Sequence, residues 1–209
     1  PGRQGYEIWV ADKKDSLWLP AKNITALLGN GKYLKTCGIS ANGTQLLLVL
    51  EDPENSEIYQ STLKKGRWSK AELLPKPVNS KANETHASFS ADGKTIWFTS
   101  NRKGGSGDLD IYRSEWNGEK WGAAQNMGPA VNTPYNEETP FETADGKGLY
   151  FSSEGHKSMG GYDIFRYELN GPDAQSLNLG YPVNTTDNNL FFDPAGDGTI
   201  GYYSRWDGN

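Results

Sequence analysis

The feature that most constrains the fold of this chain is an internal repeat of about 52 residues. An Asn-Gly or Asp-Gly dipeptide recurs in steps of 50, 53 and 52, beginning at Asn42, Asp92, Asp145 and Asp197. A triplet of an acidic residue, isoleucine and an aromatic residue recurs at similar steps, beginning at Glu7, Glu57, Asp110 and Asp163. A Trp with Ala three residues later (Trp18, Trp68 and Trp121) and a Val-Asn pair (Val78, Val131 and Val183) repeat alongside them. Four markers at one step indicate a repeat protein.

Each repeat predicts four short antiparallel strands. In the clearest copy, residues 87–90 precede Asp92-Gly93, a dipeptide that favours a type I′ hairpin turn. Residues 95–99 follow as a β-branched and aromatic strand, and residues 110–114 and 121–124 supply two more. No stretch of helical length has a sustained period of 3.6, so we expect little helix. Four strands in about 50 residues are typical of one blade of a β-propeller.

Counting strands predicts an all-β protein, a β-propeller of four blades within one domain, residues 1–209. Residues 6–11 and 16–23 match the third and fourth strands of a blade. Three full blades follow at about 35–80, 85–132 and 138–184, and first and second strands lie near 190–192 and 199–204. The half-blades are complementary, so we expect residues 1–24 and 186–209 to build the last blade together. The alternative is a stretch of a larger array.

Composition excludes several classes of function. The net charge is −5 with no basic block, which disfavours nucleic-acid binding. The longest apolar run, residues 46–50, is far too short to span a membrane. A single cysteine, Cys37, allows neither an internal disulfide nor a cysteine metal cluster. Because the sequence starts at Pro1 without a signal sequence, we expect a processed chain or an excised domain.

Two copies of the repeat resemble a known family. Phe-Ser-Ala-Asp-Gly-Lys at residues 89–94, Trp-Phe-Thr-Ser-Asn-Arg at 97–102 and Gly-Gly-Tyr-Asp-Ile-Phe-Arg at 160–166 are similar to the WD40-like Pro-Asp repeat of TolB-type propellers. The longer spacing, the paired glycines and the Val-Asn element resemble the variant in Bacteroidetes OmpA-family outer-membrane proteins, among them the PorE-type component of type IX secretion. Glu51-Asp52-Pro53 and the stretch around Asp193-Pro194 depart from the pattern.

The resemblance implies a periplasmic, outer-membrane-associated scaffold that binds other proteins of an envelope complex. The sequence contains no OmpA-like peptidoglycan-binding module. We therefore predict a non-enzymatic interaction protein without cofactor or metal. The alternatives are a glycan- or peptidoglycan-binding propeller, a propeller-type glycan hydrolase, the gating propeller of a serine peptidase, and a kelch-like propeller.

Several repeated polar and aromatic residues are interpreted as structural. Acidic residues that recur at one blade position fit a shared role, such as accepting backbone N–H groups of a loop. We expect Trp68 and Trp121, together with Trp18, to pack between blades. The acidic residues assigned this structural role are Asp92, Asp110, Asp145 and Asp163.

One group of residues that do not repeat strictly is the candidate binding site. In propellers the innermost strand of each blade lines the axis, and the segments leading into these strands form one mouth. Here those segments, residues 83–86, 136–139 and 187–189, are polar and mostly acidic. Converging negative charge would favour a basic partner segment. The candidate residues are Glu84, His86, Glu137, Glu138, Asp187 and Asn188.

Overall fold

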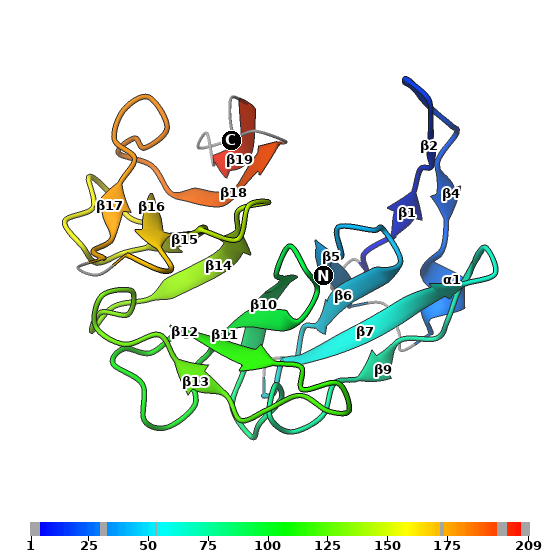
Figure 1. The fold of residues 1–209 in the computed structure, drawn as a ribbon, viewed down its shortest axis with the longest axis horizontal. Coiled ribbons are helices and arrows are strands. Elements are labelled where there is room, and N and C mark those ends of the chain that lie inside the picture. Colours follow the sequence, from blue (N-terminus) through cyan, green and yellow to red (C-terminus); the bar gives the residue numbers. More distant parts are fainter. Residues whose placement is uncertain (1–4, 30–32, 53, 172–173, 196–199, 206–209) are drawn as a thin grey trace.

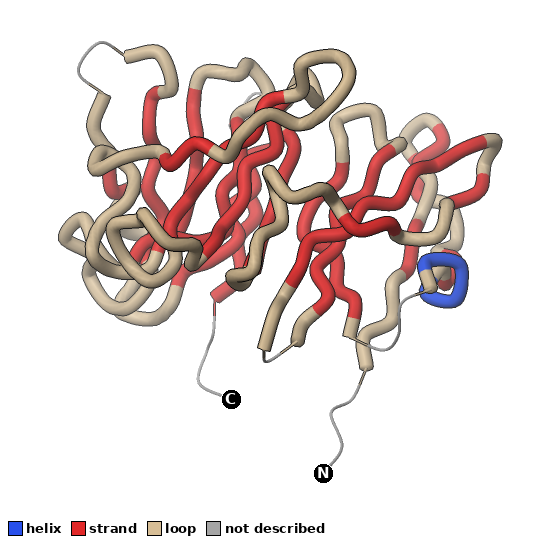
Figure 2. Tube along the Cα trace, turned by 90° about the horizontal axis from the view of Figure 1, so that it is seen from below, coloured by secondary structure: helices blue, strands red, loops and turns tan. Residues whose placement is uncertain are grey.

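Antiparallel strands make up almost all of the regular structure. The computed structural model describes residues 5–29, 33–52, 54–171, 174–195 and 200–205. Four-residue α1 (Thr25–Leu28) is the one helix in these ranges, and Figure 2 shows it to one side of the strands. The expectation of an all-β fold with little helix is confirmed.

Three full sheets form the middle of the molecule. The first contains β5 (Leu34–Ile39), β6 (Gln45–Leu50), β7 (Glu57–Lys64), β8 (Arg67–Trp68) and β9 (Glu72–Leu73). The second runs β10 (Glu84–Phe89), β11 (Thr95–Ser100), β12 (Asp110–Glu115) and β13 (Gln125–Asn126). The third runs β14 (Glu137–Glu142), β15 (Gly148–Ser153), β16 (Asp163–Glu168) and β17 (Leu177–Asn178). We call them the first, second and third blades.

Shorter sheets lie at the two ends of the arc in Figure 1. At one end β1 (Trp9–Val10) pairs with β4 (Lys22–Asn23), and the hairpin of β2 (Lys13–Lys14) and β3 (Leu17–Trp18) projects beyond them. At the other end β18 (Asn189–Ala195) pairs with β19 (Ile200–Arg205). The Asp197-Gly198 turn between those two strands lies outside the described residues.

The repeat inferred from sequence is a structural repeat. The aromatic residue of each triplet pairs with the last strand of its own sheet, as Trp9 with Asn23, Tyr59 with Leu73, Tyr112 with Asn126 and Phe165 with Asn178. The isoleucine before each aromatic residue is almost completely buried, at 5% exposure for Ile8 and 0% for Ile58, Ile111 and Ile164. The sequence register of the third strand is therefore confirmed in all four copies.

The Asx-Gly turns differ from the predicted type I′ geometry. Gly93 has φ of 70°, but Asp92 is not among the described residues with positive φ. The Gly93 N–H donates to Ser90 O, and Asp92 Oδ1 accepts from the Ser90 hydroxyl and from the Lys94 N–H. The side chain itself thus closes the turn, and only glycine takes the left-handed conformation. Asn42 and Asp145 accept equivalent hydrogen bonds.

The predicted pairing of the two chain ends is not found in the described part of the chain. There β1 pairs with β4 and β18 pairs with β19, and Figure 1 shows these sheets at opposite ends of the arc. Closure depends on the angle between neighbouring blades, which a count of strands does not contain. The number of blades in a closed ring stays a prediction.

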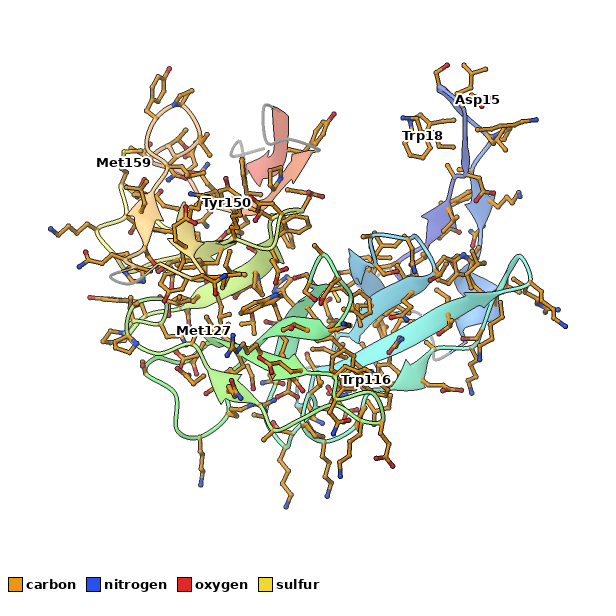
Figure 3. The ribbon with its side chains drawn as sticks, viewed as in Figure 1. Asp15, Trp18, Trp116, Met127, Tyr150 and Met159 are labelled. Carbon is orange, nitrogen blue, oxygen red and sulfur yellow. The ribbon has the colours of Figure 1, made fainter. Side chains whose placement is uncertain are left out.

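The three repeated tryptophans do not share one environment. Trp68 is 7% exposed and shares a core cluster with Ile8, just before β1, and Leu28 of α1, both of which precede its own blade in the chain. Trp121, 8% exposed, packs in the same way with Ile58 of the first blade. Trp18 is 68% exposed, and Figure 3 shows it on the projecting hairpin near Asp15. The expectation that Trp18 packs between blades is wrong here, because no described sheet precedes the one formed by β1 and β4.

Candidate binding site at the axis

The first strands of the sheets, β5, β10, β14 and β18, lie side by side. The Ser88 hydroxyl of β10 donates to Pro140 O of β14 at 2.7 Å. A Cβ on Gly38 of β5 would lie 2.7 Å from Ala87 O of β10, so this close approach requires glycine. These four strands are the inner strands that the sequence predicted at the axis.

Each inner strand has an irregularity in its pairing near its third residue. In β10, β14 and β18 the third residue is itself unpaired, whereas in β5 the shift follows Thr36, which pairs with Leu48. Thr139 and Phe191 hold φ values of 52° and 58°, which is uncommon for residues other than glycine. Such bulges redirect side chains, and the four residues at this position all line one cavity: Thr36, His86, Thr139 and Phe191.

The cavity has a volume of about 520 Å³. Its lining comes from the four inner strands, together with Leu46 of β6 and residues 8–11 at the amino-terminal end. Most of its walls are apolar, with Phe89, Phe141 and Phe192 among them. Burial raises the pKa of the Cys37 thiol in this wall to about 12. A mostly apolar hollow of this size is typical of a ligand or side-chain binding site.

Glu84, predicted at the mouth, is instead part of the interior of the second blade. Its side chain is fully buried and accepts hydrogen bonds from the Ser80 N–H and from the Ser80 and Ser100 hydroxyls. Arg102 Nη2 lies 3.0 Å from its Oε1. The carboxylate is therefore already paired and cannot serve an incoming partner.

Glu137 occupies the same place in the third blade. It too is fully buried, and it accepts hydrogen bonds from the Thr133 N–H and from the Thr133 and Ser153 hydroxyls. Burial raises its pKa to about 7; these hydrogen bonds oppose the shift, and the charge of Asp110 adds to it. The sequence placed Glu84 and Glu137 in segments that lead into inner strands; in the structure they are the first residues of β10 and β14, and both are buried rather than exposed at the mouth.

The two candidate residues in the segment before β18 differ, because one has a structural role and the other lies on the surface. Asn188 accepts a hydrogen bond from the Tyr162 N–H, just as Asn83 and Asn136 accept from Ser56 and Leu109. Asn188 is thus another member of the repeat, and it ties one blade to the next. Asp187 is exposed.

The two remaining candidates contact each other beside the cavity. Glu138 Oε2 lies 3.1 Å from Nδ1 of His86, and Glu138 Oε1 accepts a hydrogen bond from the Tyr162 hydroxyl at 3.2 Å. Burial raises the pKa of Glu138, but the neighbouring His86, the Tyr162 hydroxyl and the charge of Lys35 outweigh it, so the pKa falls below its usual value. Burial, then the charges of Glu138 and Glu154, raise the pKa of Tyr162. The structure therefore unites three residues from two blades.

The repeated aspartates hold loops. Asp110 accepts from the backbone N–H groups of Ser106 and Gly107, and Asp163 accepts from the N–H of Met159. In the turns, the Lys94 N–H and the Ser90 hydroxyl lower the pKa of Asp92. The Thr143 hydroxyl and the Lys147 N–H do the same for Asp145.

A buried asparagine in each blade was found in the sequence but given no role there. Asn79 accepts from the Ile58 N–H and donates to Ile58 O, and both bonds measure 2.8 Å. Asn132 and Asn184 do the same to Ile111 and Ile164. The Val-Asn marker was the signal, since a polar residue recurring beside a buried valine needs a partner of its own.

The described ranges contain neither a cluster of metal-ligating side chains nor a helix that could span a membrane. No three His, Cys, Asp or Glu side chains gather there as a metal site. The described helix, α1, is also far too short to traverse a bilayer.

The sheets and their axial cavity define the class of the fold, a β-propeller-like array of the TolB type. TolB from Acinetobacter baumannii is similar with a TM-score of 0.56 and 19% identity over 88% of this chain and 42% of that one. A putative TolB from Agrobacterium tumefaciens has a TM-score of 0.54 and 16% identity over 80% and 59%. The chain therefore spans less than two thirds of either protein.

Other matches limit what the likeness says about function. A putative 6-phosphogluconolactonase from Bacteroides uniformis has a TM-score of 0.50 and 14% identity over 97% of this chain and 61% of that one. No protein-family model matches the sequence, and no curated protein is significantly similar to it. At these identities the similarity establishes the fold alone.

Proposed function

We propose that this protein is a non-enzymatic, periplasmic interaction module that binds a segment of a partner protein at the axial mouth. The observation that carries the proposal is the cavity of about 520 Å³ where four inner strands converge. Strands of a propeller are committed to packing, so binding is left to the axis and the connecting loops. The TolB-type fold supports the periplasmic setting.

The wider setting follows the family resemblance of the repeats. We propose an outer-membrane-associated envelope complex, of the type IX secretion kind, as the assembly that contains the partner. A basic segment remains the proposed partner chemistry, and it now depends on exposed Asp187 because Glu84 and Glu137 are buried. Charge at such a rim changes association rate and specificity more than affinity.

The burial of Glu137 determines which substitution can test binding at the mouth. Reversing Glu137 to Lys would place an ammonium group in a fully buried site and would destabilise the fold. Asp187→Lys alters the mouth without that cost, and Glu119→Lys, an exposed position after β12, is the matched control.

A photo-crosslinking residue at position 187 should capture a partner in cells that the same residue at position 119 does not. Binding of the purified partner at low salt should weaken about threefold or more in Asp187→Lys, and stay unchanged in Glu119→Lys. Equal capture from both positions would move the site off the axis. Turnover of a peptide, glycan or lactone that stops after a single carboxylate substitution would show an enzyme.

A further inference from the structure

The imidazole of His86 has an unused nitrogen beside the axial cavity. His86 is only 9% exposed and lines the cavity, while its Nδ1 lies 3.1 Å from Glu138. Both ring nitrogens are buried without a well-aligned hydrogen bond among the described residues, but Nδ1 faces the Glu138 carboxylate whereas Nε2 faces no charged group. Buried polar atoms usually have a partner. An unpaired nitrogen at a cavity of ligand size therefore marks a point where an occupant can bind.

The neighbours of His86 determine what Nε2 offers. An ionised carboxylate only accepts hydrogen bonds, and the Tyr162 hydroxyl already donates to the other oxygen of Glu138. In the neutral imidazole, Glu138 beside Nδ1 thus favours the tautomer that carries its proton on Nδ1. Nε2 of this form presents a lone pair, so its ligand must bring a donor.

The other residues that line the cavity determine which further chemical properties an occupant needs. Ser88 and Thr139 both line the cavity, but the Ser88 hydroxyl bonds to Pro140 O and the Thr139 hydroxyl lies 2.9 Å from that of Ser152. The ring of Phe191 packs edge to face on the imidazole, with centroids 5.1 Å apart, and is the half-exposed wall that a ligand meets first. The cavity accordingly combines an apolar, aromatic surface with the buried imidazole of His86, and its exposed carboxylate is Asp193.

We propose that the axial cavity binds a tryptophan or tyrosine side chain of the partner segment. The ring packs among the phenylalanines, and the indole N–H or phenol O–H donates to His86 Nε2. A lysine could also donate, but its charge would lose hydration among the apolar walls around His86, and Asp193, the carboxylate in the lining, is exposed rather than buried beside the imidazole. The inference rests on the proposed function for the idea that a partner segment enters the mouth.

The test uses the whole chain and pairs of probes that differ by one donor. N-acetyltryptophanamide is compared with its indole N-methyl derivative, and N-acetyltyrosinamide with its O-methyl ether. Nitrogen NMR of the histidines reports binding, with His156, whose Nε2 lies 2.8 Å from Val131 O, as an internal reference. We expect the donor probes to shift His86 Nε2, to leave His156 unchanged, and to bind about fivefold more tightly than the methylated probes.

Substitution at position 86 separates the hydrogen bond from the cavity. His86→Phe keeps a ring and removes the acceptor, so it should abolish the difference between the paired probes, whereas His156→Phe should retain it. His86→Gln supplies an amide oxygen as a replacement acceptor, so it should keep the difference between the paired probes. It is the second variant if His86→Phe does not fold. Equal affinity of the paired probes for the parent protein, or no shift at His86, would overturn the inference. A partner crosslinked at position 187 despite that result would leave the proposed function standing.

Discussion

The second and third blades have the same architecture, but the buried carboxylate of each has different hydrogen-bond and charge partners. In the second blade, Arg102 reaches Glu84 and the carbonyl of Val78, and its guanidinium lies 4.8 Å from the ring of Phe98. In the third blade, His156 contacts the carbonyl of Val131 and lies 6.0 Å from Phe151, which matches Phe98 in the repeat. Glu137 is bound only by the Thr133 and Ser153 donors.

This difference shows which part of the repeat is structural. A fully buried carboxylate at the start of the inner strand occurs in both blades, whereas its cation occurs in one. Neutral donors therefore suffice to hold the geometry. In the third blade, burial raises the pKa of Glu137 to about 7.

The largest effect should come from removing the cation of the second blade. Arg102→Ala leaves Glu84 buried without a charged partner, and we expect a loss of about 3–5 kcal/mol in unfolding free energy, as for other broken buried ion pairs. Chemical denaturation measures it. Arg113→Ala, whose partner Glu115 is exposed, should cost less than about 1 kcal/mol. Similar small losses in both variants would mean that the Glu84 pair contributes little.

Next in size is the effect of truncating the buried isoleucine that each of the two blades has at the same position. Ile111 and Ile164 are both fully buried at the same blade position. Truncating either to Ala should cost roughly 2–5 kcal/mol, and the two costs should agree within about 1 kcal/mol. Thermal and urea unfolding provide the values. A cost near zero for one of them would break the equivalence of the blades at their core.

The smallest effect is a difference in pH dependence between the blades. The folded pKa of Glu137 lies near 7, above the ordinary value of 4.5. Its contribution to stability is thus complete below about pH 4.5 and is lost as the pH rises through 7. Glu137→Gln stays neutral, so the fall in unfolding free energy between pH 5 and pH 8 should shrink by on the order of 2 kcal/mol after allowing for solvent screening.

Glu84→Gln is the control for that measurement. It removes the charge that pairs with Arg102 and should destabilise the protein at both pH values. If Glu137→Gln and the parent protein fall in parallel between pH 5 and pH 8, Glu137 is ionised throughout, and the contrast between the blades does not extend to their protonation.

The spacing of the repeat was enough to predict the first three strands of each full blade and the buried isoleucines, because both depend on local pattern. The prediction of a fourth strand at residues 121–124 was wrong, since the last strand of that blade is Gln125–Asn126. Ile58, Ile111 and Ile164 follow an acidic residue and precede an aromatic one in a β-rich stretch, and all are buried. The turns were predicted in place but not in type, because the choice depends on whether the Asp92 side chain bonds to its own loop. That choice rests on a few hydrogen bonds, which composition does not record.

The sequence by itself determined a repeat near 52 residues, the first three strands of each full copy, and the buried position of the repeated isoleucines. Only the tertiary structure decided where the polar residues of the inner strands point. It buried Glu84 and Glu137, exposed Asp187, and brought His86 against Glu138 at 3.1 Å. His86 and Glu138 lie 52 residues apart on neighbouring inner strands, so the bulges and the angle between two blades set their distance. Those are properties of packing between repeats, and periodicity within a sequence does not contain them.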